Sequence, residues 1–170
     1  GGTRGRTPAR RRALAMRSTQ RGYLQTLRSD APVELIWQAL VRPEALRLWH
    51  AEDAVVDPRR GGRYGYRSRL FGRREAHIDV FEPGRRLRLV FDPNPSWPAA
   101  PHDVIVEDFL IDTRPTGTRK QQSQLRLLGS GVPAAAEWNA THRRLQAGWA
   151  VAFSYLQQRL EGRELERIAS

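Results

Sequence analysis

AAAEWNATHRRLQAGWAVAFSYLQQRLEG, residues 134–162, predicts one long amphipathic α-helix near the end of the chain. Its apolar residues recur at steps of three and four, so they form one stripe along the helix. Pro133 precedes the stretch and Gly162 ends it, as is typical of a helix start and stop. At about 1.5 Å per residue the helix is roughly 39 Å long, so its stripe needs a broad partner surface. The stripe consists of Trp138, Leu145, Trp149, Ala152 or Phe153, Leu156 and Leu160, with His142 filling the gap after Trp138.

The composition predicts one domain with a substantial core of its own, because the chain has 170 residues. It contains no cysteine, which excludes disulfides, thiolate metal sites and cysteine nucleophiles. No apolar run approaches the roughly 18 residues that a membrane span needs, and no signal-peptide core is present. We therefore expect a cytoplasmic protein without a membrane span.

The net charge of +11 is concentrated at the start of the chain. Residues 1–18 carry glycine, proline and arginine without an apolar period, and we interpret them as a disordered basic tail. The domain then covers residues 19–165, and residues 166–170 form a C-terminal tail. Lys120 is the only lysine among 29 basic residues, a bias better explained by a GC-rich coding sequence than by phosphate contacts. A solvated leader is the favoured interpretation of the tail, and binding of nucleic acid or anionic lipid is the alternative.

Strand patterns fill most of the chain before the long helix. A first strand over 20–27 is followed by a helix over 33–41, which Pro43 ends, and by a shorter helix over 43–49. The Pro-rich segment 92–101 cannot join a sheet ladder and must be a loop. Six or seven antiparallel strands result, which predicts an α+β fold whose curved sheet wraps around the long helix. The remaining predicted strands are 54–57, 63–68, 76–81, 86–91, 103–113 and 123–128.

Several short motifs carry a family likeness. Their order and spacing resemble the START-like SRPBCC superfamily, and within it the group of activators of heat-shock-protein ATPase homologues. The resemblance covers roughly residues 22–162 and implies a helix-grip fold with an internal cavity between sheet and helix. Val80 stands where many members carry a glutamate. The motifs are APVELIWQAL at 31–40, PE at 43–44, LW at 48–49, GGRY at 61–64, EPGRRL at 82–87 and GW at 148–149.

The sequence contains no motif that indicates a metal site or a catalytic nucleophile. The histidines are scattered without an i, i+4 pair or an HExxH pattern, so we predict no metal site and no cofactor. No G-x-S-x-G motif is present, Ser130 more simply ends a strand, and Gly61-Gly62 lacks the sequel of a phosphate loop. The four histidines are His50, His77, His102 and His142.

A cavity of aromatic and apolar side chains with a few polar tips would suit a hydrophobic small molecule. We place Trp49 and Trp97 at its mouth, although aromatic side chains fill cores as readily as they line pockets. Glu107 shares a strand face with apolar residues, so burial would raise its proton affinity and suit general acid or base catalysis. The simpler alternative leaves Glu107 exposed or paired with an arginine. The candidate ligand-binding residues are Trp49, Tyr64, Tyr66, Ile78, Val80, Leu89, Phe91, Trp97, Phe109, His142, Leu145, Trp149 and Phe153.

Three classes of function follow. The leading hypothesis is a binder of an aromatic or polyketide-like molecule, in natural-product biosynthesis or self-resistance. The second is a polyketide aromatase/cyclase in which Tyr64, Tyr66 or Glu107 moves protons. The third is a co-chaperone-like module, or a nucleic-acid binder that uses the arginine-rich tail. We expect a monomer or a weak homodimer.

Overall fold

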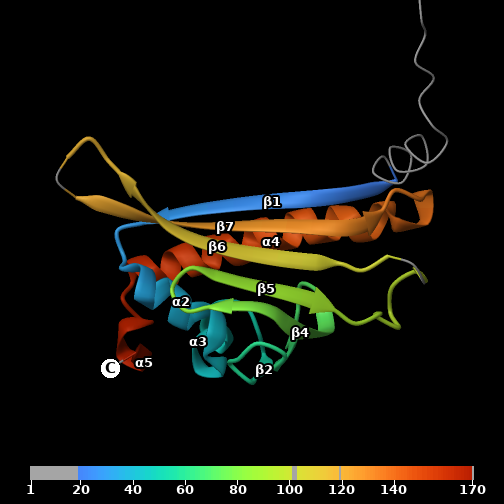
Figure 1. Cartoon of the computed structure of the whole chain (residues 1–170), viewed down its shortest axis with the longest axis horizontal. Coiled ribbons are helices and arrows are strands. Elements are labelled where there is room, and N and C mark those ends of the chain that lie inside the picture. The colour runs from blue at the N-terminus through green and yellow to red at the C-terminus, as the bar shows by residue number, and fades with distance from the viewer. Residues whose placement is uncertain (1–18, 101–102, 119, 170) are drawn as a thin grey trace, which may run out of the picture.

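In the part of the chain that the structure describes, seven antiparallel strands form a single curved sheet in the order β1-β7-β6-β5-β4-β3-β2 (Figure 1). The computed structural model describes residues 19–100, 103–118 and 120–169. This confirms the predicted α+β helix-grip architecture, because the long helix α4 lies along one face of the sheet. The strands are β1 (Gln20–Ser29), β2 (Asp53–Val56), β3 (Arg63–Ser68), β4 (Gly72–Glu82), β5 (Arg86–Phe91), β6 (Val106–Pro115) and β7 (Gln121–Pro133).

The helices begin and end close to the predicted residues. Pro43 occupies the first turn of α3, where a missing N–H costs nothing, and so separates α3 from α2. The long helix starts later than predicted, because a 3-10 turn precedes it. The helical elements are α2 (Val33–Val41), α3 (Pro43–Trp49), the 3-10 turn η1 (Ala136–Trp138), α4 (Asn139–Glu161) and α5 (Glu166–Ala169).

The core fills the space between the sheet and α4. The apolar stripe of α4 is buried along its length, and α4 contacts β1 on one side and α3 on the other. Each fully buried leucine or phenylalanine side chain contributes about 1.5–3 kcal/mol of hydrophobic stabilisation. The buried stripe comprises Leu145, Trp149, Ala152, Phe153, Leu156 and Leu160.

A β-bulge in β4 makes the alternation of inward-facing and outward-facing side chains differ from the prediction. The register between β4 and β5 shifts between Ile78 and Val80, which exchanges the faces that later residues occupy. Phe81 therefore packs against the core, edge-on to Trp37 with 5.3 Å between ring centroids. Val80, predicted as a pocket residue, is half-buried and pairs with Arg88 instead.

The ends of β6 and β7 also differ from the prediction. β6 begins at Val106 rather than Asp103, and β7 extends beyond the predicted strand at both ends. The segment predicted as a C-terminal tail contains α5, and Arg42 donates a hydrogen bond to the Ile168 carbonyl at 2.7 Å. The predicted basic tail, residues 1–18, lies outside the described residues, as does His102.

Candidate functional site

An arginine and a glutamate form an ion pair inside the core. Arg74 of β4 is 2% exposed and Glu107 of β6 is fully buried. Arg74 lies on the same face of β4 as Ala76 and Ile78, which are also buried, so strand alternation forces it inward. Its Nη1 donates to both carboxylate oxygens of Glu107, at 3.1 Å for Oε2, and to the hydroxyl of Tyr66 at 3.0 Å.

Burial and the ion pair act in opposite directions on the pKa of each group. Burial opposes the charge on Arg74, but Glu107 together with Tyr66 and Tyr23 outweighs it and holds the pKa of Arg74 above its ordinary value. For Glu107, burial raises the pKa and the neighbouring Arg74 guanidinium only partly offsets that effect. Removing either partner would leave the other as an uncompensated buried charge, which is costly.

Polar atoms without partners surround this pair. Among the described residues, the hydroxyl of Tyr23, Nε1 of Trp149 and Nη2 of Arg74 have no partner in hydrogen-bond geometry, although Tyr23 and Trp149 lie close enough to Glu107 to lower its pKa. The ring nitrogens of His50 have none either. Such buried orphans are rare in folded proteins and mark places where water or a ligand completes the bonding.

His50 is enclosed by aromatic rings. It stacks on Trp49 and Trp149, with centroid separations of 5.0 and 4.7 Å, and its centroid is 4.4 Å from that of Tyr66. Burial, and then the nearby Arg74 charge, lowers the pKa of His50 to about 3. His50 is therefore neutral at physiological pH.

A pocket of about 750 Å³ is lined by Arg74 of the ion pair and by the described residues of the loop between β5 and β6. We call it the loop pocket. Asn94 shapes the loop, because its side chain donates to the Arg73 carbonyl at 3.1 Å and accepts from the backbone N–H of Ser96 at 2.9 Å. The lining comprises residues 73–75, 91–100, 103–105, Gly131, Pro133 and Trp138.

Aromatic rings connect the loop pocket to the buried arginine. The guanidinium carbon of Arg74 is 3.7 Å from the ring centroid of Phe91 and 5.2 Å from that of Trp97. Trp97 in turn meets Trp138 edge-on, at 6.3 Å between centroids. All four residues line the loop pocket, so its wall combines an apolar surface with one buried cation.

Residues 30–161 match the family described as "Activator of Hsp90 ATPase homolog 1-like protein". The chain belongs to this family. That result confirms the resemblance drawn from the short motifs. Comparison with curated proteins found no match.

Solved structures share the fold of this family member at low sequence identity. Protein MLL2253 from Mesorhizobium loti is 22% identical with a TM-score of 0.67, over 83% of this chain and 97% of that one. CalU16 from Micromonospora echinospora is 19% identical with a TM-score of 0.64, over 87% and 82% of the two chains. DynU16, a protein in the dynemicin biosynthetic locus, is 18% identical with a TM-score of 0.62, over 82% of this chain and 47% of that one.

Two predicted ligand-binding residues, Phe91 and Trp97, line the loop pocket of this family member. Trp49 is not at its mouth: it is buried, and its indole N–H donates to the Ala39 carbonyl at 3.0 Å. The predicted cavity lay between sheet and α4, but the side chains there pack against one another. The predicted residues that belong to the core are Trp49, Tyr64, Tyr66, Ile78, Leu89, Phe109, Leu145, Trp149 and Phe153.

The polar candidates also lie outside the loop pocket. His142 is half-buried and its Nε2 donates to the Gly22 carbonyl at 2.8 Å. The hydroxyl of Tyr64 donates to the Leu40 carbonyl at 2.7 Å. Glu107 is paired with an arginine, as its simpler alternative had it, yet it is buried rather than exposed.

Sequence reasoning missed Arg74 and the role of Trp138. Arg74 lies two and four residues before the apolar Ala76 and Ile78, so it falls on the same face of the strand. A charged residue at such a position was the available signal. Within the described ranges, no three histidine, aspartate or glutamate side chains gather as metal ligands. None of the described helices is long and apolar enough to cross a membrane.

Proposed function

We propose that this protein binds an apolar, aromatic small molecule in the loop pocket. The observation that carries the proposal is the pocket itself, about 750 Å³ in volume and walled by Phe91, Trp97 and Trp138. Ligand sites for small molecules typically occupy about 300–1,000 Å³ and are mostly apolar with a few polar groups.

The loop supports this function by its stiffness. Pro93, Pro95 and Pro98 restrict the backbone of the segment that forms the outer wall. A wall that is already ordered loses little conformational entropy when a ligand binds, which favours affinity. Trp97 and Trp138, set edge-on, offer flat faces for an aromatic ligand.

We further propose that the ligand is polyketide-like and that the protein acts in natural-product biosynthesis or self-resistance. DynU16, which shares the fold, is a protein in the dynemicin biosynthetic locus. Binding is favoured over cyclase catalysis by the positions of the polar candidates. Tyr64, Tyr66 and Glu107 lie behind the pocket wall, and burial raises the pKa of both tyrosines. Deeply buried tyrosines held by structural hydrogen bonds are poor proton donors to a substrate.

Titration with N-phenyl-1-naphthylamine, an uncharged fluorescent aromatic, tests this function. We expect its emission to rise with saturation on the wild type, and Trp97→Ala to weaken binding by about fivefold or more. Tyr155→Ala is the matched control, because Tyr155 is an exposed aromatic on α4 outside the pocket, and its affinity should equal that of the wild type. Absence of saturable binding, or equal affinity of both variants, would refute the proposal.

A further inference from the structure

Arg74 has bonding capacity that the protein leaves unused. Its Nη1 is engaged by Glu107 and by the hydroxyl of Tyr66, but Nη2 has no acceptor in the described part of the chain. A buried guanidinium N–H without an acceptor loses its hydration without compensation. Some acceptor atom from outside the protein is therefore favoured at this position.

The buried cluster around Arg74 holds more donors than free acceptors. Tyr23 and Trp149 lie close enough to the Glu107 carboxylate to lower its pKa as donors, so they compete with Arg74 for the same two acceptor oxygens. Tyr23 and Arg74 are close enough for each to alter the pKa of the other. An excess of donors suits an oxygen that only accepts, such as that of a carboxylate, a phenolate or a conjugated carbonyl.

Arg74 also belongs to the wall of the loop pocket, although its side chain is only 1% exposed. Arg74 belongs to the pocket lining, and its guanidinium carbon lies within cation–π distance of Phe91 and Trp97, which are lining residues too. A ligand whose ring lies against these aromatics would hold its substituents beside the cation. The wall of the pocket thus combines apolar rings with a buried guanidinium that is paired with Glu107.

We propose that Arg74 is the recognition group of the loop pocket, and that it selects an aromatic ligand carrying an anionic oxygen. This inference rests on the proposed function and narrows the ligand class. Glu107 and Tyr66 hold the guanidinium in place through Nη1, while Nη2 donates to the ligand oxygen. Because the ion pair already exists in the free protein, the guanidinium is held in one orientation before a ligand binds.

Competition against N-phenyl-1-naphthylamine tests the inference. The competitors are 2-naphthoate and its uncharged isostere 2-isopropenylnaphthalene, each displacing the fluorescent probe from the wild type. We expect 2-naphthoate to bind about tenfold more tightly, the gain of a charge-assisted hydrogen bond in a buried site. No displaceable probe binding would refute the proposed function. Probe binding with no preference for 2-naphthoate would overturn only the role of Arg74.

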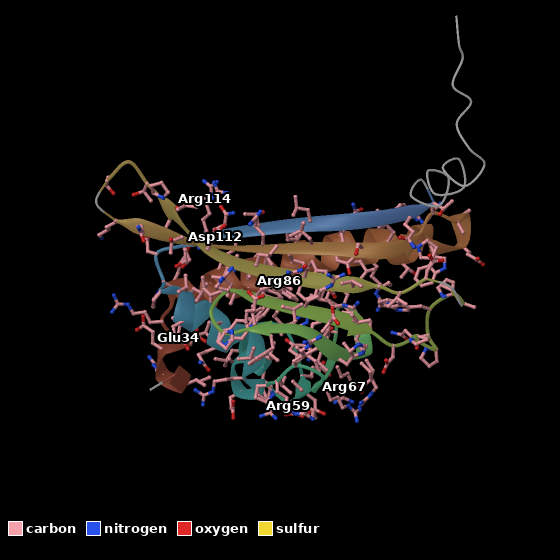
Figure 2. All side chains as sticks on the ribbon, in the orientation of Figure 1. Glu34, Arg59, Arg67, Arg86, Asp112 and Arg114 are labelled. Atoms are coloured by element: carbon pink, nitrogen blue, oxygen red, sulfur yellow. The ribbon has the colours of Figure 1, made fainter. Side chains whose placement is uncertain are left out.

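Variants separate Arg74 from the general positive charge of the protein. In Arg74→Met/Glu107→Leu, an apolar pair replaces the ion pair at similar volume, and the preference should reverse in favour of the isostere. Glu107→Gln leaves the cation without its counter-charge, so the preference should increase. Arg114→Gln removes a surface charge at the end of β6 away from the loop pocket (Figure 2) and should leave the preference unchanged. An equal loss of preference in Arg114→Gln and in the double variant would contradict the inference.

Discussion

The guanidinium carbon of Arg74 lies 3.7 Å from the centre of the Phe91 ring. Phe91 pairs with Ala76 across β4 and β5, so Arg74, two residues before Ala76, is its diagonal neighbour on the buried face of the sheet. The ring covers a guanidinium that Glu107 neutralises from another strand. The cation–π contact with Phe91 and the ion pair with Glu107 therefore both stabilise the buried guanidinium of Arg74.

Phe91→Leu should destabilise the protein by about 2 kcal/mol, since it removes both buried area and the face that the cation contacts. Urea unfolding of four proteins isolates the cation–π part: the wild type, Phe91→Leu, the double variant Arg74→Met/Glu107→Leu, and the triple variant. Without the cation, the cost of Phe91→Leu should fall by about 1 kcal/mol. An equal cost in both backgrounds would show that Phe91 contributes by packing alone.

Arg74→Met alone should cost about 3–5 kcal/mol at pH 7, because it leaves Glu107 buried without a partner. The double variant Arg74→Met/Glu107→Leu should recover most of that loss. The deficit of the single variant should shrink at pH 5. An isolated Glu107 has a pKa further above its unfolded value, so the folded state takes up a proton as the pH falls and gains stability relative to the unfolded chain.

Urea unfolding at the two pH values measures these differences. A single variant as stable as the wild type at pH 7 would contradict a buried, charged Glu107.

The sequence predicted the fold well because periodicity determines it. The stripe of the long helix, the alternation of the strands and the proline-rich loop are local patterns, and each reappears in the structure. The β-bulge near Val80 was not predictable from alternation, since one extra residue in β4 leaves no mark on composition. Strand ends depended on pairing with neighbours, which explains the longer β7.

The candidate site was predicted only in part. The apolar residues of sheet and helix were expected to leave a cavity between them, but whether side chains fill such a space depends on packing that sequence does not encode locally. Phe91 and Trp97 line the loop pocket because Phe91 directly precedes the Pro-rich loop and Trp97 lies within it. Arg74 and Glu107 come from different strands, and only the sheet topology brings them together.

His50→Leu should remove part of the acid sensitivity of folding. The folded state holds the pKa of His50 at about 3, against an ordinary 6.5, so the unfolded chain binds the extra proton between these values. Stability from this group is complete above about pH 6.5 and is lost as the pH falls toward 3, by at most about 5 kcal/mol.

Urea unfolding at pH 7 and pH 5 should show that the wild type loses about 2 kcal/mol more than His50→Leu over this interval. His77→Leu, at an exposed histidine of β4, is the control and should follow the wild type. Parallel losses in wild type and His50→Leu would show that His50 is protonated in the fold.

Gly148→Ala should destabilise the protein although alanine is the better helix former. A Cβ at Gly148 would lie 2.5 Å from Cε1 of Phe71, a buried ring that also contacts Trp149, with 5.2 Å between centroids. Because Phe71 has little room to withdraw, overpacking of about 1–3 kcal/mol should exceed the gain of about 1 kcal/mol in helix propensity. The Gly148-Trp149 motif is then a packing requirement of α4.

Ala147→Gly, at the exposed neighbouring position of α4, measures the propensity effect by itself and should cost about 1 kcal/mol. Thermal and urea unfolding of both variants give the two contributions separately. If Gly148→Ala were more stable than the wild type by the amount that Ala147→Gly loses, the Phe71 ring would have moved aside without cost. The close approach of α4 to the segment joining β3 and β4 would then not depend on glycine.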